Sequence, residues 1–258
     1  MSVESAKEKA RTDEKYQLYY GPSIPGRGEP IRLAFEEAGA SYEEDMAYTQ
    51  SGTLTNLLKD ETHFAPPILR HDDLEISQLP NIMLYLGQKF KLVPESDEAK
   101  FRVNQYFLTI MDLQNEAHDV HHPISVVRYY EDQKDAAKER AKEFREARIP
   151  KLFKHFETVL SKNKESKGEW LYGTDLTYAD LALYHLVKGL LFAFPRAVGD
   201  ILNDYPKIFD LHCRVKARPR IAAYLESERC PKFSNGLYRH YEELDSSEKD
   251  VPGKGGKE

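Results

Sequence analysis

Cysteine is scarce in this sequence, which has only Cys213 and Cys230 among its 258 residues. Neither cysteine has the spacing of a metal-binding or redox motif, so a disulfide framework is excluded and a reducing, cytoplasmic environment is expected. No apolar run is long enough for a membrane-spanning helix, and residues 1–14 lack the apolar core of a signal peptide or anchor. The net charge of −6 is spread over both signs, without the basic stripe of a nucleic-acid-binding surface.

The remaining composition is that of a globular protein. Hydrophobic residues make up 40% and charged residues 31% of the chain, which is long enough for one large or two modest domains. Residues 91–98 form a charged connection with a proline, which predicts a domain boundary between residues 15–90 and residues 98–240. The charged ends at 1–14 and 241–258 are predicted to be disordered tails.

The most informative stretch begins with a short strand. Tyr16, Leu18 and Tyr20 share one face of that strand and Tyr19 points to the other, because strand side chains alternate. Residues 21–28 are rich in glycine and proline and therefore predict a loop. Tyr20 is thus expected on the last position before the turn.

A helix is expected to follow directly. Pro30 suits the first helical turn, and Ile31, Phe35 and Ala38 continue at helical spacing. The phenol of a strand-end tyrosine would then face the positive end of a helix, with Arg27 between them. This arrangement favours binding of an anion.

The run from Lys15 to Arg32 resembles the start of cytosolic glutathione transferases of the tyrosine type, closest to the sigma, pi and mu-like classes. The resemblance implies an α/β thioredoxin-like N-terminal domain followed by an all-α helical bundle. It also implies glutathione as co-substrate without a metal, a second substrate that is a small hydrophobic electrophile, a homodimer, and a detoxifying role in the cytoplasm. It covers nearly all of the chain that is expected to fold.

The same resemblance assigns the catalytic residues. Gly26-Arg27-Gly28-Glu29-Pro30-Ile31-Arg32 matches the family pattern Gly-Arg-x-Glu-x-Ile-Arg, which places Arg27 on the arginine that assists catalysis. Tyr20 then falls on the tyrosine that donates its hydroxyl to the glutathione sulfur, with a turn about one residue longer than usual. The added residue leaves Tyr19 as the alternative.

Glutathione-binding residues are implied further along the first domain. A hairpin predicted from residues 68–76 follows Pro66-Pro67, and the resemblance implies a cis peptide bond at Pro67. The residue before it pairs its backbone with glutathione in the family, but Pro66 has no N–H to give. The family's Gln-Ser pair aligns with Gln78-Leu79, so the hydroxyl is lost, unless Ser77 replaces it through a shift of one residue.

The second domain is predicted to be helical. One long helix is expected over residues 135–160 and a central, almost wholly apolar helix over residues 180–194. Thr177 and Asp180 have the spacing of a capping box at the start of the central helix. His118 and His122 are four residues apart on an earlier helix, but no third ligand is evident, so the sequence favours ordinary helix-end histidines over a metal site.

The function expected from the resemblance is conjugation of the glutathione thiolate to an electrophile. Two alternatives remain open at this stage. One is a non-catalytic module of the same fold that binds hydrophobic ligands or mediates assembly, which the departures at Pro66 and Leu79 favour. The other is a glutathione-dependent isomerase or peroxidase, which would use the same thiolate and differ only in the second-substrate pocket.

Overall fold

The computed structural model describes residues 14–48, 53–56, 58 and 62–245. Its sheet has the order β2-β1-β3-β4, with β1 parallel to β2 and antiparallel to β3, and β3 antiparallel to β4. The strands are β1 (Tyr16–Tyr20), β2 (Tyr42–Met46), β3 (Ile68–His71) and β4 (Leu74–Ser77). Helices α2 (Glu29–Ala38) and α3 (Leu79–Lys89) complete this unit, and the predicted thioredoxin-like arrangement is confirmed.

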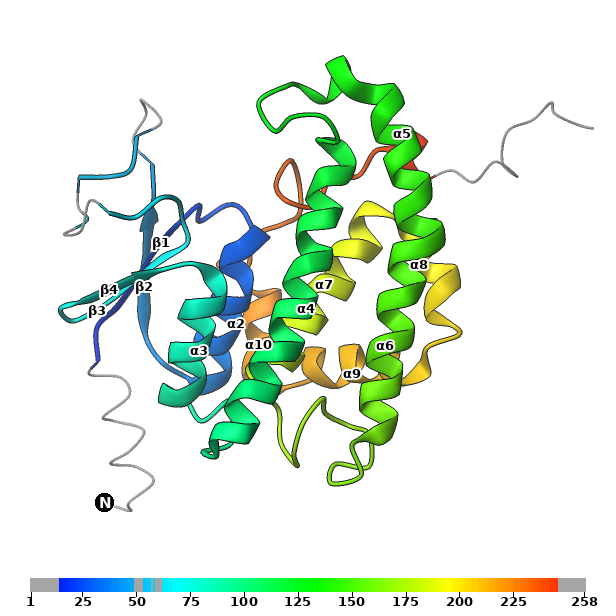
Figure 1. The fold of residues 1–258 in the computed structure, drawn as a ribbon. Coiled ribbons are helices and arrows are strands. Elements are labelled where there is room, and N and C mark those ends of the chain that lie inside the picture. The colour runs from blue at the N-terminus through cyan, green and yellow to red at the C-terminus, as the bar shows by residue number, and fades with distance from the viewer. Residues whose placement is uncertain (1–13, 49–52, 57, 59–61, 246–258) are drawn as a thin grey trace, which may run out of the picture.

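The helical part follows in the order α4 (Asp97–His121), η2 (Tyr130–Gln133), α5 (Lys134–Glu143), η3 (Phe144–Arg148), α6 (Ile149–Lys162), α7 (Tyr178–Ala193), α8 (Pro195–Leu202), α9 (Pro206–Lys216), α10 (Pro219–Glu226) and α11 (Glu242–Asp245). A single 3-10 turn, η1 (Gly26–Gly28), precedes α2. Helix α2 packs against α7 and α10, and α3 packs against α4, so these two helices lie between the sheet and the helical part (Figure 1). In the described part of the chain, no helix is both long and apolar enough to cross a membrane.

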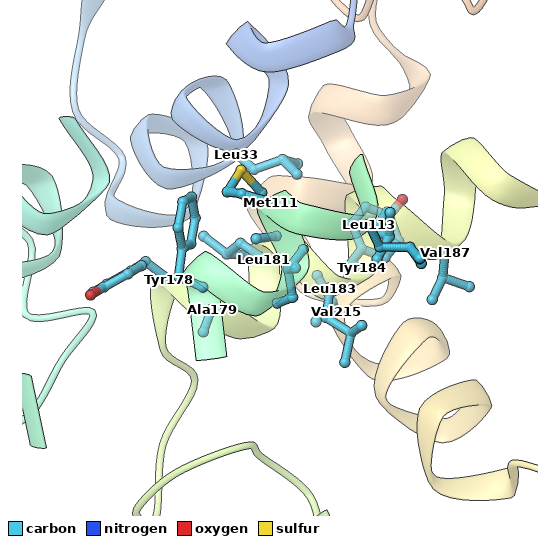
Figure 2. Packing of buried hydrophobic residues seen from close by; sticks show 14 of the residues in the cluster. Leu33, Met111, Leu113, Tyr178, Ala179, Leu181, Leu183, Tyr184, Val187 and Val215 are labelled. Carbon is cyan, nitrogen blue, oxygen red and sulfur yellow. The ribbon is translucent and has the colours of Figure 1, made fainter. Parts of the chain in front are cut away.

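Helix α7 lies at the centre of a core that is continuous between the two parts. Figure 2 shows side chains of α7 together with Leu33 of α2, Met111 of α4 and Val215 of α9. The helix begins with the predicted capping box, because the Thr177 N–H donates to Asp180 Oδ2 at 2.7 Å and the Thr177 side chain accepts from the backbone at position 180. The long helix α7 thereby holds the sheet unit and the other helices in one packed body.

Two details of the helical part were not predicted. Helical backbone runs without a break over the residues 135–160 that were predicted as one helix, but it contains the π-helical turn η3 just before Pro150, which has no N–H to continue the α-helical ladder. The predicted tail at 241–258 includes an ordered start, since α11 buries Leu244, and Asp245 accepts hydrogen bonds from the backbone N–H groups of Arg196 and Ala197 at 2.9 and 3.2 Å. Residues 246–258 lie outside the described residues, as do 1–13 of the predicted N-terminal tail.

Candidate functional site

Tyr20 lies at the end of β1, where its hydroxyl oxygen meets the backbone of η1. The N–H of Arg27 donates to this oxygen at 2.9 Å. Gly26 has a φ of +37°, and a Cβ at Gly26 would collide with the hydroxyl oxygen of Tyr20. A Cβ at Gly28 would similarly collide with the ring. The two glycines therefore allow the turn to close over the tyrosine.

Tyr19 points to the opposite face of the sheet. Its side chain is fully buried against Ala47 and Ile68, and its hydroxyl donates to Gln17 Oε1 at 3.0 Å. The guanidinium of Arg70 lies 5.0 Å from the centre of its ring. Of the two candidate tyrosines, the geometry therefore brings Tyr20, and not Tyr19, to the turn that contains Arg27.

The electrostatic surroundings of Tyr20 favour a phenol that keeps its proton. Burial raises the pKa of Tyr20 above its ordinary value, although the Arg27 N–H and the charges of Arg27 and Arg32 act in the opposite direction. The hydroxyl is therefore protonated at neutral pH. Because its oxygen already accepts from Arg27, its own proton is available for a second partner.

The side chain of Arg27 reaches across to the helical part. Its Nη2 donates to Asn115 Oδ1 of α4 at 2.9 Å. Asn115 was not a candidate in the sequence, since a single polar residue on a helix surface gives no signal. The contact fixes the position of Arg27 beside Tyr20.

Arg32 is a second residue whose role the sequence did not reveal. Its fully buried guanidinium donates to the carbonyl oxygens of Gly21 and Ile24 at 3.0 Å each, and to the carboxylates of Glu29 and Glu44. Burial alone would lower the pKa of Arg32, but Glu44 and Glu29 raise it above its ordinary value. Arg32 thus holds the loop between β1 and η1 in place.

His185 holds the same turn from the other side. It lies on α7, is buried, and places Nε2 3.0 Å from the carbonyl oxygen of Gly26. Burial lowers the pKa of His185 to about 3, so its ring is neutral at pH 7 and donates to the carbonyl. In the sequence, this histidine was only an exception within an apolar helix.

The titration of His185 predicts a loss of stability in acid. An unfolded histidine has a pKa of about 6.5, so between that pH and about 3 the unfolded chain binds the additional proton and stability falls as pH falls. We expect His185→Gln, which keeps an amide donor, to reduce the slope of unfolding free energy between pH 5 and pH 6 by roughly 1 kcal/mol per pH unit. Denaturant unfolding at several pH values measures this slope in the variant and in the parent chain.

The exposed His155 provides a matched control for this experiment. His155→Gln makes the same substitution at an exposed position, so it measures what the exchange alone does to the slope of unfolding free energy against pH. An unchanged slope in His185→Gln would contradict the assignment of a neutral, buried His185.

The predicted glutathione-binding residues lie at the same edge of the sheet as Tyr20. Tyr19 of β1 pairs with Ile68 of β3, which pairs with Ser77 of β4, so Tyr20, Pro67 and Gln78 follow one another along that edge. The peptide bond between Pro66 and Pro67 is cis, as expected. The topology therefore brings together residues that are up to 58 positions apart in the chain, from Tyr20 to Gln78.

Gln78 and Leu79, at the start of α3, differ in the exposure of their side chains. Gln78 is exposed and has a φ of +70°, a backbone conformation that is sparsely populated outside glycine and that clusters at functional sites. The side chain of Leu79 instead turns into the core, with 2% of its surface exposed. Leu79 can therefore offer only its backbone N–H, and Ser77 is engaged by His63 Nδ1 at 3.1 Å from its hydroxyl.

The three histidines at the end of α4 lie close together. The ring centres of His118, His121 and His122 are between 4.7 and 5.1 Å apart. Within the described residues, no group of three His, Cys, Asp or Glu side chains is arranged to hold a metal ion.

Comparison with known proteins finds similarity to glutathione S-transferases over most of the chain. A family model described as "Glutathione S-transferase, C-terminal domain" matches residues 118–228. Glutathione S-transferase P 1 of Xenopus laevis is 29% identical, with the match covering 83% of this chain and 92% of the relative. Glutathione S-transferase Mu 5 of Rattus norvegicus is 27% identical over 81% of this chain and 88% of the relative.

A solved structure has the same fold. The structure of NaGST-2 superposes with a TM-score of 0.63 at 25% sequence identity, covering 85% of this chain and 98% of that chain. The similarity thus extends through both the sheet unit and the helical part.

Proposed function

This chain is a glutathione S-transferase of the sigma, pi and mu type in sequence and fold, and we propose that it activates glutathione as a thiolate at Tyr20 and conjugates it to small hydrophobic electrophiles. The observation that supports this most strongly is the hydrogen bond from the Arg27 N–H to the Tyr20 oxygen, at 2.9 Å. It leaves the phenolic proton free to point at a sulfur atom.

One hydrogen bond from Tyr20 is sufficient to change the state of the thiol. A free thiol has a pKa of about 8.5, so only a few per cent is thiolate at neutral pH. A hydrogen bond to the charged sulfur contributes about 1.5–3 kcal/mol, which would lower the thiol pKa by about one to two units. The Arg27 guanidinium and the start of α2 would stabilise the same negative charge.

The edge of the sheet offers contacts for the rest of glutathione. Gln78 is exposed there, and the first N–H groups of α3, which include that of Leu79, have no partner within their own helix. In this proposal they bind the glutamyl carboxylate. The carbonyl oxygen of Pro66 would accept the cysteinyl N–H, while Pro67 fixes the turn.

A non-catalytic module of the same fold is the second candidate. It is favoured by Pro66, which cannot donate a backbone hydrogen bond, and by Leu79, whose side chain is in the core instead of carrying a hydroxyl to the ligand. Two lost contacts of about 1–3 kcal/mol each would weaken glutathione about a hundredfold or more. A glutathione-dependent isomerase or peroxidase would share the thiolate site and differ in the second substrate.

Calorimetric titration with glutathione separates these functions. We expect a dissociation constant between micromolar and submillimolar, together with turnover of a neutral chlorodinitrobenzene. Binding without turnover of this electrophile, but with turnover of a hydroperoxide or an isomerisable ketone, would favour the isomerase or peroxidase. Neither binding nor turnover would contradict the transferase and support the non-catalytic module.

The proposal also includes a homodimer located in the cytoplasm, where the co-substrate is kept reduced. Phe64 and Phe101 are 90% and 75% exposed, as expected of side chains that a second copy could cover. Light scattering should give about twice the chain mass of 29.8 kDa, and cell fractionation would check the location.

A further inference from the structure

The surface beside Tyr20 contains two arginines without a carboxylate partner in the described part of the chain. Arg27 donates to the neutral Asn115 at 2.9 Å, and Arg239 Nε donates to the carbonyl oxygen of Gly236 at 3.2 Å. By contrast, Arg148 and Arg229 each pair with a glutamate. In a chain with a net charge of −6, these two guanidinium groups leave a local excess of positive charge.

Arg239 belongs to a segment that packs on the loop beside Tyr20. A Cβ at Gly236 would lie 2.9 Å from Ile24 Cγ2, so the backbone at Gly236 touches the loop between β1 and η1. His121 Nε2 lies 3.0 Å from the carbonyl oxygen of the buried Leu237 and ties the same segment to α4. The segment that carries Arg239 is thereby held near the end of α4, the helix that Arg27 contacts through Asn115.

The histidines at the end of α4 are exposed to the charges of both arginines. Burial lowers the pKa of His118 and of His122, so both rings are neutral at pH 7. The charge of Arg27 acts on His118, and that of Arg239 acts on His121 and His122. Asp119 is the acidic group in contact with the cluster, at 3.3 Å from His118 Nδ1.

The free donors of this surface suit an anionic group. Arg27 and Arg239 are both half-buried, so part of each side chain is open to solvent on this surface. Guanidinium groups offer paired donors that match the geometry of a carboxylate. A purely apolar electrophile would leave the charge of Arg239 unused.

We propose that the second substrate is an apolar or aromatic electrophile that carries a carboxylate, which Arg27 and Arg239 bind while its reactive carbon faces the sulfur held at Tyr20. This inference rests on the proposed transferase function. In the reaction, the thiolate forms a carbon–sulfur bond and the halide leaves with its electron pair. The carboxylate takes no part and serves only to orient the substrate.

A matched pair of electrophiles tests the inference. Chlorodinitrobenzoate and its methyl ester have the same reactive carbon and differ in charge. For each we would measure kcat/KM divided by the uncatalysed rate constant with glutathione, and then take the ratio of carboxylate to ester. We expect this ratio to be about ten in the parent chain, and to fall about tenfold in Arg239→Gln.

Two further variants make the result specific. Arg239→Lys keeps the charge and should retain most of the preference for the carboxylate. Arg102→Gln removes the same charge near the start of α4, where Arg102 is exposed and donates to Gln105 at 3.4 Å. It lies roughly 24 Å along the helix from His118, at 1.5 Å per residue, and should leave the ratio unchanged.

The possible results distinguish failure of this inference from failure of the proposed transferase function. Turnover of the ester without any preference for the carboxylate, or equal ratios in the parent chain and Arg239→Gln, would overturn the inference and leave the transferase function standing. Turnover of neither electrophile by the parent chain would overturn the transferase function and this inference with it.

Discussion

Replacing Tyr20 by phenylalanine should lower kcat/KM for a neutral aromatic electrophile about 10- to 100-fold at neutral pH. The variant loses the proton that the hydroxyl donates to sulfur, a bond worth about 1.5–3 kcal/mol to the thiolate. The fold should persist, since the ring remains to pack beneath Gly26 and Gly28. Steady-state kinetics over a range of pH measure the loss, which should shrink as the pH approaches the thiol's own pKa.

Tyr19→Phe is the matched control for this prediction. The Tyr19 hydroxyl donates to Gln17 on the opposite face of the sheet, so its removal should change kcat/KM less than twofold. A large loss in Tyr19→Phe together with a small loss in Tyr20→Phe would contradict the assignment of the catalytic tyrosine.

Replacing Arg32 by methionine should destabilise the protein by about 3–5 kcal/mol, because it leaves a buried carboxylate without its positive partner. Glu29 would keep the hydroxyl of Tyr224, at 3.2 Å, but lose the guanidinium, and the carbonyl oxygens of Gly21 and Ile24 would each lose the hydrogen bond from Arg32. Urea unfolding of variant and parent at equal protein concentration measures the change. Activity should fall as well, since the loop beside Tyr20 is no longer held.

An exposed arginine provides the comparison. Arg229 pairs with Glu36, but 59% of its side chain is exposed to solvent, so Arg229→Met should cost less than about 1 kcal/mol. If Arg32→Met were no more destabilising than Arg229→Met, the buried ion pairs would not hold the loop as described.

Local patterns in the sequence predicted the elements well. The alternation in β1 separated Tyr20 from Tyr19, and the spacing of Thr177 and Asp180 predicted the start of α7. Both depend on residues within a few positions of each other, where periodicity and capping chemistry decide the structure. The π-helical turn before Pro150 was missed because the apolar spacing continues on both sides of it.

The contacts that position the site could not be predicted in the same way. Arg27 and Asn115 are 88 residues apart, and Gly26 and His185 are 159 apart. Such pairs form only when α4 and α7 pack against the turn. A single residue in the sequence does not indicate this packing. The burial of the Leu79 side chain was also hidden, since it depends on how α3 packs against the rest of the core.

The central claim is that Tyr20 stabilises the thiolate of bound glutathione, and the most direct test is to titrate that thiol. Ultraviolet difference absorbance of the complex against pH would give the thiol pKa in the parent chain and in Tyr20→Phe. We predict a pKa about one to two units below the free value of about 8.5 in the parent chain, and a return toward the free value in the variant. Equal thiol pKa values in the two proteins would contradict the claim.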